Sequence, residues 1–262
     1  MRRFRPLHRI YGGLRIVQVC QDWPKWFREY LQGFNDGGID SYQMRCGINL
    51  YTRHNRSDFH MIDEIWAYRQ YDYFGCRVSP GDTVVDIGAN IGTFSVYAAT
   101  VCGASRVLSF EPFADNYRML CKNVDQNKLH MVTCVNRAIA GSRGIRNLRL
   151  NSLDSGSHSL VSGALERAVE VECYTLEDVF QRFSVAKIDY LKMDCEGAEY
   201  EILENATSRL PQIGRISMET HATSDRTEED LRVLLTSHGF DVKLNGGFRL
   251  YATRVSGNGA GG

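Results

Sequence analysis

The segment at positions 86–92, DIGANIG, carries residue types that suit ligand binding. Gly88 and Gly92 lie between an apolar run and a helix-like stretch, with Asp86 and Asn90 beside them. Glycine permits a sharp turn and a close approach of the backbone to a ligand. The free N–H groups at the start of a helix attract an anionic group. The segment therefore predicts a binding loop between a strand and a helix.

A carboxylate follows at the end of the next apolar run. Glu111 lies 23 residues after Gly88, a spacing that suits hydrogen bonds to the hydroxyls of a ribose. The dinucleotide motif G-x-G-x-x-G is incomplete, because Asn90 and Thr93 stand where its second and third glycines would be. The pattern therefore favours a ligand with a ribose and a carboxylate but no pyrophosphate, and S-adenosylmethionine is such a ligand.

Two more strand-like runs end in acidic residues and a histidine. Asp194 and Glu196 follow one run, and Glu219 and His221 follow the other. Since the carboxyl ends of parallel strands meet at one edge of a sheet, these side chains should face the same crevice as the glycine loop. We expect Asp194, Glu196 and His221 to be catalytic, with Asp194 or His221 as general base and Glu196 holding the acceptor or the donor.

The same two strand ends offer ligands for a metal ion. Asp194, Glu219 and His221 together supply oxygen and nitrogen donors, which makes Mg²⁺ a candidate cofactor, although the sequence does not fix the metal ligands.

Short β-branched runs alternate with amphipathic helix-length stretches from residue 80 onward, which is typical of an α/β fold with a mostly parallel sheet. A tight Asn-Gly-Gly turn predicts that the last two strands form an antiparallel hairpin. The seven expected strands span residues 83–89, 106–112, 131–140, 188–194, 214–220, 240–245 and 248–254. The expected helices span residues 91–102, 115–126, 176–183, 199–209 and 227–238.

The N-terminal part differs from this regular pattern, because residues 1–80 hold 15 of the 28 aromatic side chains. We expect a small cap of short helices over the crevice, lined by Asp58, Glu64, Tyr71 and Tyr73. The expected division of the chain is a cap at 1–79, a cofactor-binding domain at 80–255 with an insertion or lid at 141–175, and a flexible tail at 256–262.

Four motifs, DIGANIGTFSVYAA, FEPFADNYRML, TLEDVF and KMDCEGAEYEIL, resemble in this order the FkbM-type family of class I S-adenosylmethionine-dependent methyltransferases. The resemblance covers roughly residues 56–222 and implies a Rossmann-like, seven-stranded sheet with an antiparallel last strand. It also implies that Asp194, Glu196 and Glu199 border the methyl donor and the substrate. The expected cofactor-binding residues are Asp86, Gly88, Asn90, Gly92, Glu111, Phe113, Ala138 and Asp194.

Members of this family mostly methylate hydroxyl groups of sugars and natural products, so the resemblance implies O-methylation of a small hydroxylated acceptor. Two alternatives remain from the residues alone: an NAD(P)-dependent oxidoreductase acting on a nucleotide sugar, and a binding protein for S-adenosylmethionine without catalysis. A homodimer is a candidate assembly.

Composition limits the other partners. The 262 residues carry 31 Lys and Arg against 31 Asp and Glu, a balance that argues against a nucleic-acid-binding protein. No apolar run is long enough to span a membrane, and no secretory leader is apparent. The eight cysteines are scattered without a C-x-x-C pair, which favours reduced, mostly buried thiols and a cytoplasmic location.

Overall fold

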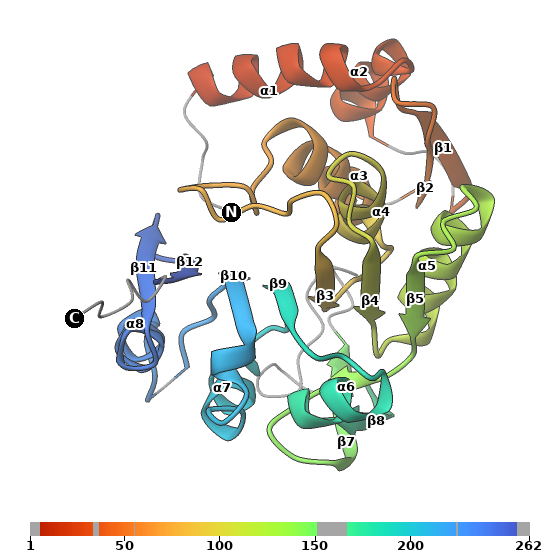
Figure 1. The fold of residues 1–262 in the computed structure, drawn as a ribbon. Helices are drawn as coiled ribbons and strands as arrows, with labels where there is room; N and C mark the ends of the chain where they lie inside the picture. Colours follow the sequence, from red (N-terminus) through yellow and green to blue (C-terminus); the bar gives the residue numbers. More distant parts are fainter. Residues whose placement is uncertain (1–5, 34–36, 55, 151–166, 224, 256–262) are drawn as a thin grey trace.

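The computed structural model describes residues 6–33, 37–54, 56–150, 167–223 and 225–255. Its centre is a seven-stranded sheet in the order β11-β12-β10-β9-β3-β4-β5 (Figure 1). Only β12 in this sheet runs antiparallel to its neighbours, so the expected topology is confirmed. The strands are β3 (Thr83–Ile87), β4 (Arg106–Phe110), β5 (Val132–Val135), β9 (Ile188–Met193), β10 (Ile213–Glu219), β11 (Phe240–Asn245) and β12 (Arg249–Arg254).

Helices cover both faces of the sheet (Figure 1). On one side lie α3 (Arg56–Ile62) and α4 (Thr93–Thr100), and on the other lie α6 (Leu176–Arg182) and α7 (Glu199–Asn205). Successive strand residues therefore enter two different cores: Val84 packs into one, and Val85 into the other. The helices after β3 are α4 (Thr93–Thr100), α5 (Ala114–Gln126), α6 (Leu176–Arg182), α7 (Glu199–Asn205) and α8 (Glu228–Ser237). Within the described ranges, no helix is both long and apolar enough to cross a lipid bilayer.

The N-terminal part contains the expected helices and also a two-stranded sheet that the sequence analysis did not predict. Its elements are α1 (Pro6–Val19), α2 (Trp23–Gln32), β1 (Ile39–Gln43), β2 (Asn49–Arg53), α3 (Arg56–Ile62) and a π-helical turn (Asp63–Ala67). The strands β1 and β2 pair antiparallel. Tyr42, Leu50 and Thr52 are buried in the pair, and Trp26 of α2 stacks on Phe59 of α3.

Asn123 of α5 and Asn127, which caps the C-terminus of α5, attach β2 to the main domain. The amide group of Asn123 accepts a hydrogen bond from the backbone N–H of Tyr51 at 2.7 Å and donates to its carbonyl at 3.0 Å. Asn127 makes the same pair of bonds with the backbone of Asn49. Asn123 also donates to the carbonyl of Ile91 at 2.8 Å. The two side chains thus act as a strand partner for β2 and join it to the glycine loop.

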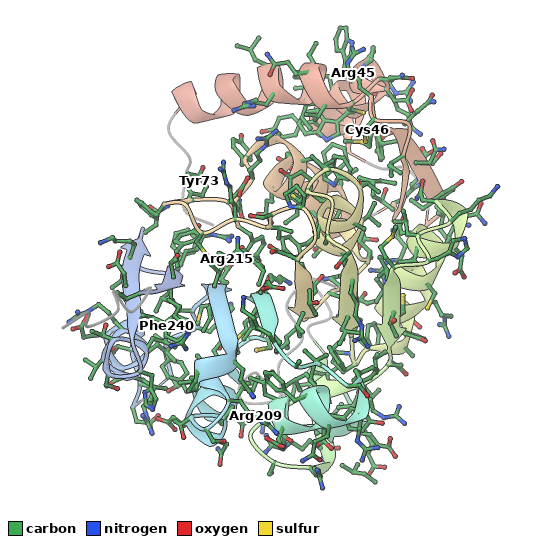
Figure 2. All side chains as sticks on the ribbon, viewed as in Figure 1. Arg45, Cys46, Tyr73, Arg209, Arg215 and Phe240 are labelled. Carbon is green, nitrogen blue, oxygen red and sulfur yellow. The ribbon has the colours of Figure 1, made fainter. Side chains whose placement is uncertain are left out.

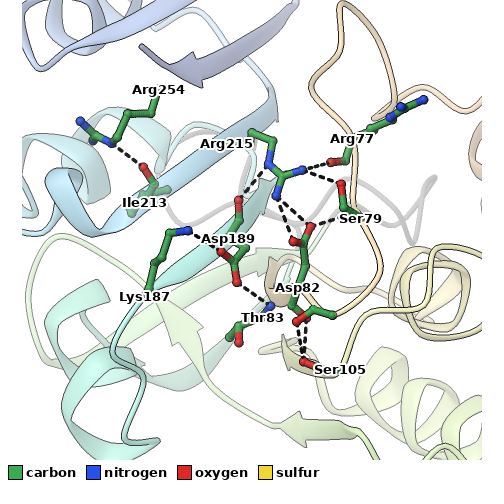
Figure 3. Close-up of polar contacts among 11 residues, drawn as sticks. Arg77, Ser79, Asp82, Thr83, Ser105, Lys187, Asp189, Ile213, Arg215 and Arg254 are labelled. Atoms are coloured by element: carbon green, nitrogen blue, oxygen red, sulfur yellow. Dashed lines mark hydrogen bonds and ion pairs between the residues drawn. The ribbon is translucent and has the colours of Figure 1, made fainter. Parts of the chain in front are cut away.

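The end of the sheet away from the glycine loop is fixed by Arg215 of β10 (Figure 3). Its guanidinium forms two 3.0 Å bonds to the carboxylate of Asp82, which precedes β3, and donates to the carbonyl of Arg77 at 2.6 Å. Asp189 of β9 accepts from the backbone N–H of Thr83 at 3.0 Å. The bonds of Arg215 tie the segment leading out of the N-terminal part to β10, and the bond of Asp189 joins β9 to the start of β3.

The prediction of one strand over residues 131–140 was wrong. The chain leaves the main sheet after β5, and β6 (Ala138–Ile139) joins β7 (Gly144–Leu150) and β8 (Arg167–Tyr174) in a separate sheet of order β6-β8-β7. The side-chain amide of Asn136 donates to the carbonyls of Glu111 and Pro112, which holds the turn against the loop after β4. The Ser-rich residues 152–163 and the tail at 256–262 lie outside the described residues.

Candidate active site

The carboxyl ends of β10, β9, β3 and β4 are adjacent in the sheet, and the residues that follow them lie together. A cleft of about 830 Å³, open to solvent, lies at this edge. The loops after β3, β4 and β9 contribute to its lining, and the N-terminal part contributes Glu64 and Tyr71. The cleft therefore brings together segments that are more than a hundred residues apart in the sequence.

Gly88 and Gly92 shape the loop after β3, and both have a positive φ, of +74° and +84°. A Cβ atom on Gly88 would lie 1.9 Å from the backbone oxygen of Asp194, and one on Gly92 would lie 2.5 Å from Cδ1 of Leu120. No side chain fits at the first position. The glycines thus allow the loop after β3 to contact the loop after β9 directly.

Asp86 lies beneath this loop and is fully buried. It accepts a 2.6 Å hydrogen bond from the hydroxyl of Ser95 and pairs with Nζ of Lys192 at 3.1 Å. The same Nζ donates to the carbonyl of Gly88 at 2.6 Å. Despite its burial, the neighbouring negative charges of Asp86 and Asp194 raise the pKa of Lys192. This ion pair fixes the floor of the cleft.

Glu111 follows β4 and is 5 % exposed. One carboxylate oxygen accepts from the backbone N–H of Asn90 at 2.8 Å, and the other accepts from that of Phe113 at 2.9 Å. Burial raises the pKa of Glu111 to about 7. Since a carboxylate can accept about four hydrogen bonds, Glu111 is held in one orientation and keeps acceptor capacity for two further donors.

Asp194 follows β9 and lines the cleft beside Gly88. Its backbone N–H donates to the carbonyl of Ile87 at 3.0 Å, and the hydroxyl of Tyr71 donates to its Oδ2 at 2.9 Å. Although burial opposes ionisation, the positive charges of Lys192, His221 and Arg249 hold the pKa of Asp194 below its usual value. Asp194 is therefore an ionised carboxylate with a fixed position in the cleft.

His221 lies after β10, between three glutamates. Its Nδ1 lies 3.1 Å from Oε1 of Glu199, and its Nε2 lies 3.4 Å from Oε2 of Glu196 and 4.0 Å from Oε1 of Glu219. Although burial opposes the charge, the hydrogen bond with Glu199 and the nearby carboxylates raise the pKa of His221 to about 10. Burial raises the pKa of Glu196 to about 8. His221 is thus an imidazolium at neutral pH.

The order of these elements and the residues at their ends agree with a known group of enzymes. Residues 86–242 match the family model described as the methyltransferase FkbM domain. The chain belongs to the FkbM methyltransferase family. Its sheet, with a single antiparallel strand next to the edge, is the Rossmann-like fold of the class I methyltransferases.

Three curated relatives show how far the similarity extends. Methyltransferase sdnD of Sordaria araneosa is 28 % identical, covering 68 % of this chain and 80 % of its own. The 31-O-demethyl-FK506 methyltransferase FkbM of Streptomyces tacrolimicus is 26 % identical with the same two coverages. The AMB antimetabolite synthetase AmbE of Pseudomonas aeruginosa is 26 % identical over 76 % of this chain, which spans 11 % of that synthetase.

Not every FkbM-family residue expected at the site lines the cleft itself. The expected residues that line it are Gly88, Asn90, Glu111, Ala138, Asp194 and Glu196. The expected residues that do not line the cleft are Asp86, Gly92, Phe113 and His221. Asp86 and Phe113 act through their bonds to Lys192 and Glu111, and His221 contacts Glu196.

Of the four cap residues expected to line the crevice, Glu64 and Tyr71 do so. Asp58 instead forms a buried ion pair with Arg53 at 2.7 Å. Tyr73 lies on the loop before β3, 37 % exposed, with its hydroxyl on the carbonyl of Tyr68 (Figure 2).

The contacts of two residues at this FkbM-family site, Lys192 and Glu199, were not predicted from the sequence. Lys192 is a single cation inside the apolar strand β9. A lysine in such a strand needs a buried acidic partner, and this placement could have indicated its role from the sequence. For Glu199, the family resemblance implied only a place beside the methyl donor and the substrate. Glu199 is fully buried and accepts from the backbone N–H groups of Cys195 and Gly197 at 3.1 and 2.9 Å, as well as contacting His221.

Proposed function

We propose that the protein transfers the methyl group of S-adenosylmethionine to a hydroxyl group of a small molecule. The observation that carries this proposal is the buried Glu111 carboxylate, which is held by two backbone N–H groups and lines the same cleft as the carboxylates of Asp194 and Glu196. One end of the cleft suits a ribose, and the other end suits a positive charge.

The ribose end depends on Glu111. A carboxylate at the end of the second strand is suited to accept both hydroxyls of a ribose, and Glu111 retains that capacity after its two backbone bonds. Ala138 and Ile139 of β6, with Phe110, give this part of the cleft an apolar surface suited to an adenine ring.

The methionine end depends on the loop after β3. Asn90 lines the cleft, and among the described residues no donor reaches its buried Oδ1. Buried acceptors are normally hydrogen-bonded, so this oxygen is suited to the amino group of the methionine moiety. Asp194 and Glu196 complement the positive sulfonium, and the loss of that charge on transfer favours product release.

The acceptor would bind between the sulfonium and the N-terminal part, where Glu64 and Tyr71 line the cleft. A lone pair of its hydroxyl oxygen attacks the methyl carbon, the carbon–sulfur bond breaks, and S-adenosylhomocysteine leaves as a neutral thioether. The hydroxyl proton passes to Asp194. We assign this role to Asp194 and not to His221, because His221 already carries a proton at neutral pH.

Two further findings support the proposal. The FkbM methyltransferase of Streptomyces tacrolimicus carries a name that describes methylation at an oxygen, which favours a hydroxyl acceptor and a natural product as its class. All eight cysteines are free thiols, which is in keeping with a reducing compartment such as the cytoplasm.

The proposal is tested by incubating the protein with S-adenosylmethionine labelled in its methyl group and a panel of hydroxylated acceptors. We expect label in an acid-stable ether of an acceptor, detected by mass shift. Release of S-adenosylhomocysteine without a methylated hydroxyl, or label on nitrogen only, would contradict O-methylation.

Asp194→Asn is expected to lower the rate of methyl transfer by about 10²–10⁴-fold, the usual contribution of a general base. Single-turnover kinetics would measure this loss, with Asp241→Asn on the exposed strand β11 as the matched control. S-adenosylhomocysteine affinity should stay within about threefold, since the amide keeps the shape of the carboxylate. Unchanged turnover in Asp194→Asn would remove the proposed role.

The affinity for S-adenosylhomocysteine should rise with pH because of Glu111. Ribose hydroxyls donate to the ionised carboxylate of Glu111. Its pKa of about 7 means that Glu111 in the free protein is largely protonated below pH 7. Binding below pH 7 therefore requires that this proton is first lost. Affinity should therefore be about tenfold lower at pH 6 than at pH 8. Calorimetry on Glu111→Gln should show weaker binding without this pH dependence, and an equal slope in both proteins would refute the assignment.

A further inference from the structure

We infer that Asp194, Glu196 and His221 form a binding site for one divalent transition-metal cation at the acceptor end of the cleft. Two carboxylate oxygens and an imidazole nitrogen of these residues lie within 4.8 Å of one another. Ligand atoms that share an ion at about 2.0–2.2 Å lie at most about 4.4 Å apart. The three side chains would thus need to close by only a few tenths of an ångström.

The orientation of His221 supports a metal ligand more directly than the cluster of charges does. A metal-bound histidine usually donates its second ring N–H to a carboxylate, which fixes the ring and directs the other nitrogen to the ion. Nδ1 of His221 has such a partner in Oε1 of the fully buried Glu199, at 3.1 Å. Nε2 is thereby directed toward Glu196, 3.4 Å away. The ion takes the place of the Nε2 proton that His221 carries at neutral pH, and Nδ1 keeps the proton that it donates to Glu199.

Glu199 also holds the loop after β9, which carries Asp194 and Glu196. Glu199 accepts from the backbone N–H groups of Cys195 and Gly197, which flank Glu196. Asp194 is fixed independently by Tyr71 and by its backbone bond to Ile87. All three ligand side chains therefore come from segments with fixed positions, whereas Glu219 is drawn away by its 2.8 Å ion pair with Arg249.

The ligand types select the class of ion. Carboxylates alone suit Mg²⁺ and Ca²⁺, whereas an imidazole nitrogen favours first-row transition metals. A three-residue set also leaves coordination positions open. This step rests on the proposed function. We assign these open positions to the hydroxyl of the acceptor, or to two neighbouring hydroxyls. Good acceptors are then limited to small molecules whose hydroxyl can reach the ion.

The test is the binding of Co²⁺ to the metal-free full-length protein, followed by its visible absorption, without S-adenosylmethionine or acceptor. We expect one equivalent of Co²⁺, with Mg²⁺ a poor competitor. His221→Ala should weaken binding by at least about 100-fold, and Glu199→Gln should weaken it by about 10–100-fold. His238→Ala is the matched control and should bind as wild type, because His238 caps the C-terminus of α8 and is not among the residues that line the cleft.

Separate titration with S-adenosylhomocysteine establishes that each variant is folded and tests the proposed function independently. A protein that binds S-adenosylhomocysteine but shows no saturable binding at millimolar Co²⁺ overturns the metal site alone. Co²⁺ binding that is unchanged in both His221→Ala and Glu196→Gln also overturns it. If His221→Ala does not fold, Glu196→Gln and the histidine-to-cobalt spectral signature of the wild type decide the question.

Discussion

Gly88→Ala should lower the affinity for S-adenosylhomocysteine by about 100-fold or more. The added Cβ would lie 1.9 Å from the backbone oxygen of Asp194, so one of the two loops must move, and a shift of about 1 Å at such a site costs about 10²-fold. A rotamer change cannot relieve the clash, because both partners are fixed by backbone geometry. Calorimetric titration of the purified variant would measure the loss.

Gly81→Ala is the matched control. Gly81 also has a positive φ, of +87°, but a Cβ there meets no atom within 4 Å. It precedes β3 at the opposite end of the strand from the cleft. This variant should show only the backbone strain, as a destabilisation of about 1 kcal/mol, and should bind S-adenosylhomocysteine normally. Equal binding by the two variants would show that contact between the loops does not form the site.

Lys192→Met should reduce the free energy of unfolding by about 3–5 kcal/mol, because it leaves Asp86 buried without its cationic partner. The carboxylate of Asp86 would keep only the hydroxyl of Ser95, and the carbonyl of Gly88 would lose its donor. The glycine loop should therefore loosen as well. Urea denaturation gives the change in stability, and titration with S-adenosylhomocysteine gives the effect on the loop.

Lys187→Met makes the same chemical change one residue before β9. Lys187 also forms an ion pair, with Asp189 at 2.7 Å, but its side chain is 64 % exposed. Exposed pairs contribute about 0–1 kcal/mol, so this variant should be nearly as stable as wild type. The double variant Lys192→Met with Asp86→Asn should lose less stability than the two single changes added together. Additive losses would contradict a direct pair.

The parts of the fold that follow from local pattern were predictable from the sequence. The alternation of β-branched runs with amphipathic helices, the glycines after β3 and the hairpin turn before β12 are each encoded within a few residues. The rule that parallel strands end at one edge then brought Asp194 and Glu111 into a single cleft.

The parts that depend on distant partners were not predictable in the same way. Lys192 pairs with Asp86, 106 positions away, and Glu199 contacts His221 in the loop after β10. The short strand β6 belongs to a second sheet whose partner, β8, lies about 30 residues further along the chain. In each case a long-range contact outweighed the local preference.

The central claim is that this cleft binds S-adenosylmethionine through Glu111 and the loop after β3. Its most direct test is calorimetric titration of the full chain with S-adenosylhomocysteine and, separately, with NADH. We predict saturable binding of one equivalent of S-adenosylhomocysteine and no binding of NADH. Binding of NADH without binding of S-adenosylhomocysteine would contradict the claim and favour an oxidoreductase.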